Sequence, residues 1–247
     1  MRERIAILTI IFLFGASWCV AKEKDCIFNV AKCYHNGEQM IYAVAGKDEK
    51  GNPIYTGTFT YRITIKDDIL TIQGLSDYSN DYLLEKKFQY DLKTNLPIGS
   101  YIKEGKTENY KEVFAGFQKD EIRINTIDKD RKGENKRTLK KKGVVYNAES
   151  SGFLLRDYPF GSKEKIYFKL LVDHEKVYTL AAEKIGEEKI VVPMGEFDCY
   201  KLKYKATGDI LTELFAPTLY IWFSKEDHKM VKFVDEDVVL SLKAYKQ

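Results

Sequence analysis

The chain has only three histidines and four cysteines, which are the side chains best suited to nucleophilic or metal chemistry. His174 precedes Glu175, but the second histidine of a zinc-protease helix would fall at position 178, which is Tyr178. Neither His35 nor His228 belongs to a recognisable nucleophile motif, and the glycine-rich phosphate and dinucleotide motifs are missing. The sequence therefore predicts a protein that is not an enzyme, with no catalytic residues and no cofactor.

The cysteines suggest a structural role instead. Cys26 and Cys33 are close in sequence, and in an oxidising compartment this spacing favours a disulfide that closes a short loop. Such a bond would add roughly 2–3 kcal/mol of stability through the unfolded state. Two free thiols are the main alternative. A metal site with His35 is a weaker one, because a fourth ligand and the usual zinc spacings are missing, so we predict no metal. Cys199 lies in an apolar strand pattern and is expected to be an inert buried thiol.

The N-terminal residues indicate export. Met1–Ala21 has a basic start, an apolar run over residues 5–14 and small residues before the charged Lys22. The apolar run is shorter than the ~20 residues that a membrane helix needs. We therefore interpret residues 1–21 as a signal peptide that is cleaved after Ala21, which places the mature protein in the periplasm.

A lipid anchor is the alternative form of export. Cys19 would carry the acyl chains of a bacterial lipoprotein. Such proteins have a small residue directly before the cysteine, whereas this chain has Trp18. Ordinary cleavage is therefore the favoured prediction.

The composition excludes several classes of protein. The chain of 247 residues is 44% hydrophobic and 31% charged, which excludes a disordered chain and a multi-pass membrane protein. Lys and Arg number 40 against 37 Asp and Glu, a net charge of +3, which is too balanced for a dedicated nucleic-acid binder. No nucleic-acid partner is expected.

Alternating apolar and polar residues predict the fold. Residues 58–65 and 200–206 place an apolar side chain at every second position, as expected of strands that are buried on one face. Turn signals recur along the chain, and only Ala148–Tyr158 has the character of a short helix. We predict a mainly β protein: one domain, residues 22–247, with a single curved antiparallel sheet and one short helix.

One basic stretch interrupts the alternation. Lys129–Lys142 has eight Lys and Arg side chains against Asp130 and Glu134. We interpret it as a solvated hairpin tip, because like charges keep a loop extended. The alternative is contact with the anionic surface of a membrane.

The last third of the chain carries a family resemblance. The segments Ile190–Lys201 (IVVPMGEFDCYK), Leu219–Ser224 (LYIWFS) and Asn147–Arg156 (NAESSGFLLR) resemble segments of an exported bacterial family called domain of unknown function 3108. Together they lie within residues 147–245. The resemblance implies a curved, half-barrel-like antiparallel sheet, similar to the periplasmic lipoprotein carriers, and implies no enzyme activity or cofactor.

The first of these segments has the residues expected of two strands joined by a tight turn. Pro193 would end one strand, Gly195 would permit a tight turn, and Phe197 would start the next strand. Trp222, on the neighbouring strand, would pack its indole under the sheet. Met194 and the basic stretch 129–142 depart from the family pattern.

The excess of aromatic side chains on strands suggests a binding function. A sheet with one aromatic face must bury it, either in an ordinary core or around an apolar cavity. We predict a non-catalytic carrier or binder of an apolar, lipid-like molecule. The alternative is a structural or assembly partner in the envelope that uses sheet edges. The candidate cavity wall is Phe59, Tyr61, Ile63, Tyr200, Leu202 and Tyr204.

Overall fold

The computed structural model describes residues 26–47, 53–79, 81–162, 165–208, 216–235 and 238–247. The predicted signal peptide, Met1–Ala21, and the alternative anchor Cys19 lie outside the described residues. No helix among the described residues is long and apolar enough to cross a membrane.

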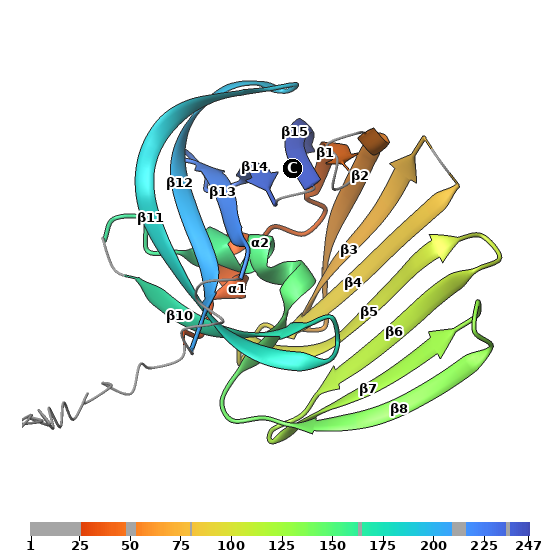
Figure 1. The fold of residues 1–247 in the computed structure, drawn as a ribbon. Helices are drawn as coiled ribbons and strands as arrows, with labels where there is room; N and C mark the ends of the chain where they lie inside the picture. Colours follow the sequence, from red (N-terminus) through yellow and green to blue (C-terminus); the bar gives the residue numbers. More distant parts are fainter. Residues whose placement is uncertain (1–25, 48–52, 80, 163–164, 209–215, 236–237) are drawn as a thin grey trace, which may run out of the picture.

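A single sheet of 15 strands dominates the molecule (Figure 1). The strands pair in the order β8-β7-β6-β5-β4-β3-β2-β1-β15-β14-β13-β12-β11-β10-β9. Their bounds are β1 Gln39–Lys47, β2 Pro53–Lys66, β3 Ile69–Tyr78, β4 Tyr82–Asp91, β5 Leu96–Lys106, β6 Tyr110–Phe117, β7 Glu121–Asp128, β8 Gly133–Lys140, β9 Val145–Asn147, β10 Ile166–Val172, β11 Lys176–Val192, β12 Gly195–Thr207, β13 Thr218–Ser224, β14 Met230–Val234 and β15 Val238–Lys246.

The prediction of a mainly β protein with one curved antiparallel sheet is confirmed, with one local exception. Every pair of neighbouring strands is antiparallel except β9 and β10, which run parallel. A tight turn cannot join parallel strands, so the chain between β9 and β10 crosses over. This crossover contains the predicted helical segment.

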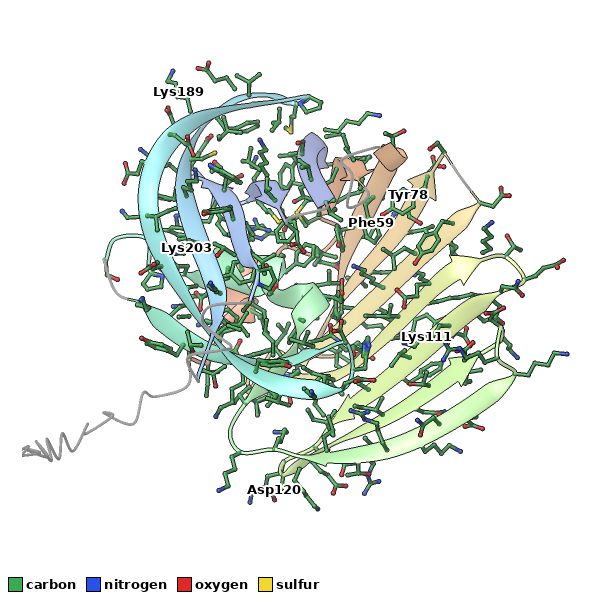
Figure 2. The ribbon with its side chains drawn as sticks, viewed as in Figure 1. Phe59, Tyr78, Lys111, Asp120, Lys189 and Lys203 are labelled. Atoms are coloured by element: carbon green, nitrogen blue, oxygen red, sulfur yellow. The ribbon has the colours of Figure 1, made fainter. Side chains whose placement is uncertain are left out.

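The predicted alternation determines two faces of the sheet. Phe59, Tyr61 and Ile63 on β2 are buried, and so are Leu70 and Ile72 on β3. We call the face that carries these residues the inner face, and the opposite face the outer face. The two halves of the sheet curve so that their inner faces look toward each other, and side chains fill the space between them (Figure 2).

Short helical turns lie inside this curve. Ala148–Ser150 (η1), Ser151–Leu154 (α2) and Leu155–Asp157 (η2) follow one another, which confirms the helical character predicted for Ala148–Tyr158. Asn147 caps the first turn, because its side-chain oxygen accepts a hydrogen bond from the backbone N–H of Glu149 at 2.9 Å. The sequence missed a second short helix, α1 (Val30–Cys33).

One continuous stretch, Val145–Phe160, lies inside the curve, and we call it the inner segment. Seven of its apolar side chains are at most 4% exposed: Val145, Tyr146, Phe153, Leu154, Leu155, Tyr158 and Phe160. Val145 and Leu171 pack on the inner face of β6 and β7, against Val113 and Ile124. The rest of the inner segment belongs to the larger core between the two halves of the sheet.

The hairpin of β11 and β12 confirms the predicted turn of the family motif. β11 ends at Val192 and β12 begins at Gly195, whose φ of +140° is in the region that favours glycine. The sequence also predicts a turn at residues 185–188, which contain Gly186, and this prediction is wrong. β11 continues through them with a bulge between Lys184 and Gly186. A bulge accommodates one extra residue in one strand, so the pairing with β12 continues on both sides of it.

Trp222 does not lie under the sheet, as its apolar character had suggested. It pairs with Lys201, one position away from the inner-face pair of Ile221 and Leu202, so it is on the outer face. Its indole N–H donates to Glu188 at 2.7 Å, and the Lys201 and Lys232 ammonium groups lie 4.9 and 5.4 Å from its ring. Polar partners explain its low exposure of 7%.

Candidate functional site

The six predicted wall residues all belong to, or pack against, the main core. Five of them are at most 4% exposed: Phe59, Tyr61, Ile63, Leu202 and Tyr204. The sixth, Tyr200, is partly buried and packs against the same core. The sequence therefore selected residues that face inward together from both halves of the sheet.

The inner segment covers this wall. The ring of Phe153 lies 4.4 Å from the ring of Tyr61, and Phe160 stacks on Tyr200 at 4.7 Å. On β12, the Tyr204 hydroxyl lies 3.2 Å from the hydroxyl of Ser151. None of the six residues lines either of the two pockets described below. Among the described residues, the predicted wall thus packs against the chain's own side chains.

The predicted disulfide is not present in the structure. Cys26, Cys33 and Cys199 are free cysteines. Cys33 lies on α1, where its thiol donates to the carbonyl oxygen of Asn29 at 3.5 Å, and burial raises its pKa to about 12. Cys199 is fully buried as predicted, with a pKa also raised by burial to about 12. A thiol with such a pKa is almost entirely protonated near neutral pH, so neither is a ready nucleophile.

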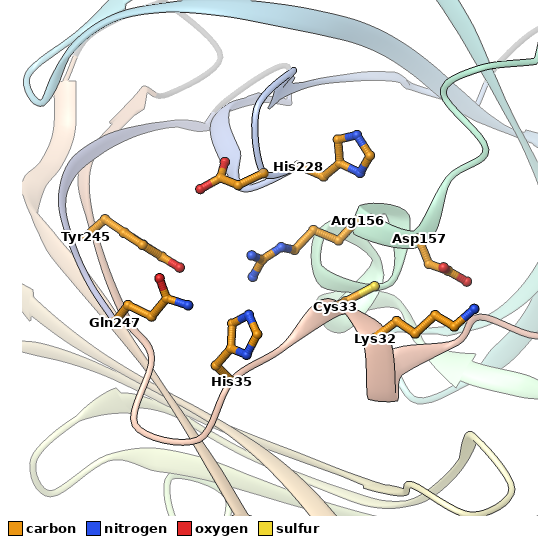
Figure 3. A pocket seen from close by; sticks show the side chains of 9 residues that line it. Lys32, Cys33, His35, Arg156, Asp157, His228, Tyr245 and Gln247 are labelled. Atoms are coloured by element: carbon orange, nitrogen blue, oxygen red, sulfur yellow. The ribbon is translucent and has the colours of Figure 1, made fainter.

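A polar pocket opens at the end of the curve, between the N-terminal described residues and the last strands (Figure 3). Its volume is about 210 Å³. We call it the mouth pocket; its lining is Lys32, Cys33, His35, Arg156, Asp157, Asp227, His228, Tyr245 and Gln247. These residues come from α1, η2, the turn between β13 and β14, and β15 with the residue after it.

Arg156 is the central side chain of the mouth pocket (Figure 3). It is 5% exposed and pairs with Glu38, which is 0% exposed, with an Nη1–Oε1 distance of 2.5 Å. The guanidinium carbon also lies 4.8 Å from the ring of Tyr34. Glu38, Tyr34 and a further side-chain hydrogen bond with Tyr245 thus fix the guanidinium in one position at the lining of the pocket.

The acidic side chains of the pocket already have partners. Asp157 accepts a hydrogen bond from the backbone N–H of Asn29 at 2.5 Å. Asp227 pairs with the Lys229 ammonium at 2.8 Å. Lys32 has no ion pair or hydrogen bond from its ammonium group among the described residues and adds a cation at the rim. The Lys32 ammonium is thus a spare donor at the rim, whereas each of the two carboxylates already has at least one partner.

His228 does not add a positive charge near neutral pH. Burial lowers its pKa, Asp227 raises it by a smaller amount, and Arg156 lowers it. The ring packs against Phe160 at 4.4 Å, which accounts for its partial burial. No group of three or more His, Cys, Asp or Glu side chains among the described residues could hold a metal ion.

The lowered pKa of His228 predicts a pH-dependent stability. The unfolded chain binds the proton more tightly, since an unperturbed histidine titrates near ~6.5. The contribution of His228 is therefore complete above that pH and is lost as the pH falls through ~6.5 toward the folded pKa. His174, whose pKa burial also lowers, acts in the same direction. We expect the free energy of unfolding, measured in urea, to fall as the pH is lowered below about 6.5.

His228→Asn tests this assignment. His228 has a φ of +54°, and asparagine adopts that backbone conformation readily. The variant should be less stable at neutral pH, because it loses the contact with Phe160, and its stability should depend less steeply on pH. A pH profile parallel to that of the wild type would contradict the assignment.

The sequence did not identify the Glu38–Arg156 pair. Arg156 was visible only as the last residue of the family-like segment Asn147–Arg156. Glu38 precedes β1 with no motif around it. The pairing depends on a contact across 118 positions, so no local pattern could have shown it.

Comparison with known proteins gives a family and two distant structures. A family model described as "Protein of unknown function (DUF3108)" matches residues 53–245, and no curated protein matches. A putative lipoprotein from Parabacteroides distasonis is 14% identical, with a TM-score of 0.31, over 90% of this chain and 100% of that one. A putative exported protein from Bacteroides fragilis is 10% identical, with a TM-score of 0.32, over the same shares. Scores this low carry no argument about fold or function.

Proposed function

This chain belongs to the DUF3108 family of unknown function, and we propose that it is an exported, non-catalytic binding protein that holds an acidic group at the mouth pocket. The fixed guanidinium of Arg156 is the observation that carries the proposal. A carboxylate or a phosphate is the class of group that complements a forked set of N–H donors. The signal peptide predicted at Met1–Ala21 supports a periplasmic location.

The surroundings of Arg156 support binding more than catalysis. Cys33 has a raised pKa and makes a poor nucleophile. His228 contacts aromatic rings and has no nucleophile partner among its described contacts. The pocket is also smaller than the ~300–1,000 Å³ typical of sites for drug-sized ligands. It suits a small acid or the acidic end of a larger molecule.

Carriage of an apolar molecule is the second version of this proposal. An acyl chain would need the space that the inner segment occupies, because Phe153 and Phe160 pack directly on Tyr61 and Tyr200. That version requires the inner segment to leave the core, at the cost of exposing its buried side chains to water. It therefore has less support than binding at the mouth pocket.

Binding of inorganic phosphate, acetate and a fluorescent fatty acid tests both versions. We expect phosphate or acetate to shift the NMR signals of His35 and His228. Lys32→Ala should weaken this binding several-fold, because it removes a cation at the rim. Lys66→Ala is the matched control, since Lys66 is an exposed lysine at the end of β2, outside the pocket.

The outcomes separate the two versions. Equal binding by the two lysine variants, or no shift with either anion, would overturn the assignment to the mouth pocket. Binding of the fatty acid alone would support apolar carriage in its place.

A role as an assembly partner in the envelope is the alternative function. β8 forms one edge of the sheet, so the backbone groups along its unpaired edge could pair with a strand of another protein. However, Lys136, Arg137 and Lys140 lie on this strand, and charged side chains are a common protection against such pairing. The edge therefore favours this alternative only weakly.

Contact with a membrane through Lys129–Lys142 has limited support. The stretch forms the tip of the β7–β8 hairpin, β8 and the two residues after it. Five of its eight basic side chains have partners within the protein: Arg131 with Asp128, Lys136 with Glu134, Lys140 with Glu121, Arg137 with the Glu175 carbonyl, and Lys141 with the carbonyls of Lys119 and Gly143. These partners reduce the charge available to anionic lipids.

A further inference from the structure

A second hollow lies on the outer face of the sheet, over β3 to β6. Its volume is about 700 Å³. Gly99 and Gly116 lie side by side in the pairing of β5 and β6 and form its floor. The two glycines leave the face without side chains at this point. The full lining is Gln73, Glu85, Lys87, Gln89, Gly99, Ser100, Tyr101, Phe114, Ala115 and Gly116.

An aromatic shelf borders the glycine floor. Tyr101 and Phe114 are cross-strand partners, with ring centroids 4.9 Å apart. The Tyr101 hydroxyl donates to Glu112 at 2.9 Å, which fixes the orientation of that ring. Phe114 is 41% exposed although it belongs to a residue type that is usually buried. The two rings are tilted by 43° to each other, so the shelf offers an angled apolar surface to a ligand.

Polar side chains border the rest of the hollow. The amides of Gln73 and Gln89 each carry two donors and one acceptor oxygen. Their hydrogen bonds, to Glu85 and Thr71, are both 3.5 Å long, so a ligand could replace them at low cost. The Lys87 ammonium makes no ion pair or hydrogen bond among the described residues. Donors and acceptors are thus both available around the shelf.

From this arrangement we infer that the outer hollow binds the sugar ring of a carbohydrate. A pyranose ring has an apolar face of C–H groups, which fits the aromatic shelf, and hydroxyls that both donate and accept, which fit the amides. A purely apolar ligand would leave the amides unsatisfied. A polyanion such as a nucleic acid has little to attract it, since Glu85 and Lys87 are the charged residues of the lining and their charges offset each other.

Filling the floor tests this inference with little effect on the fold. A Cβ at Gly116 would meet no atom within 4 Å, so Gly116→Val should fold while its side chain occupies the hollow. Gly186→Val is the matched control, because a Cβ at Gly186 on β11 also meets nothing within 4 Å. Phe114→Ala removes the exposed half of the shelf and leaves the inner face untouched.

Chitotriose, maltotriose and adenosine serve as probes, with titrations followed by NMR. We expect at least one of the two sugars to shift signals of residues around Gly99 and Gly116. Gly116→Val and Phe114→Ala should each weaken that binding about tenfold or more, a loss of about 1.4 kcal/mol, whereas Gly186→Val should not.

Three results would overturn the inference. One is that neither sugar binds; another is that adenosine alone binds, which would assign the shelf to a nucleobase. The third is that Gly116→Val and Gly186→Val bind the sugar with equal affinity. The test changes and observes no residue of the mouth pocket, so its result is independent of the proposed function.

Discussion

Glu38→Gln is expected to lower the free energy of unfolding by about 3–5 kcal/mol, because it leaves the buried guanidinium of Arg156 without its counter-charge. The introduced amide can still accept a hydrogen bond from Arg156. The loss of stability therefore measures the missing negative charge and not a change in the shape of the side chain. Urea unfolding followed by circular dichroism measures it. Glu196→Gln is the control: its partner Lys189 is exposed, so the loss there should be at most about 1 kcal/mol.

A double variant separates the charge from the packing. Glu38→Leu combined with Arg156→Met removes both charges and keeps apolar volume, so it should recover most of the stability that either single change loses. A loss of less than about 1 kcal/mol for Glu38→Gln would mean that water reaches the pair, contrary to the burial of both side chains.

Tyr61→Ala is expected to cost about 3–5 kcal/mol, by analogy with Phe→Ala in a packed core. The ring of Tyr61 is 4% exposed and lies 4.4 Å from Phe153 and 4.6 Å from Phe59. It also covers Gly74, its partner on β3, where an added Cβ would lie 2.7 Å from it. Thermal and urea unfolding measure the loss. The exposed Phe114→Ala should cost far less.

The same variant distinguishes a packed core from a ligand cavity. In a packed core, Tyr61→Ala leaves a void and creates no affinity for the fluorescent fatty acid. Wild-type stability together with altered fatty-acid binding would show instead that the inner segment opens, and would favour apolar carriage.

The sequence predicted the sheet well because its signal is local. Alternation along β2 and β12 requires only that one face be buried, and the structure buries Tyr61 and Leu202 as that pattern predicts. The turn at Gly195 was equally visible. The family match over residues 53–245 confirms the resemblance and extends it to the first half, where no motif had been recognised.

The candidate site was predicted less well because its signals are not local. Alternation shows that Tyr61 faces inward but not that Phe153, far along the chain, covers it. The spacing of Cys26 and Cys33 suggested a disulfide, whereas α1 holds Cys33 against Asn29. The indole of Trp222 was predicted to pack under the sheet, whereas it is buried on the outer face beside Glu188 and two lysines.

The pairing of β1 with β15 has a consequence for how the chain matures. Gln39 pairs with Lys246, so two strands near opposite ends of the described chain meet in the middle of the sheet. The hairpins from β2 to β8 can form early, because their strands are close in sequence. The pairing of β1 with β15 can form only after β15 has been synthesised. Until then β1 is an exposed edge that other chains can join. Folding of the whole sheet is therefore a late event, and mutations that slow the pairing of β15 should appear first as aggregation of the incompletely folded chain.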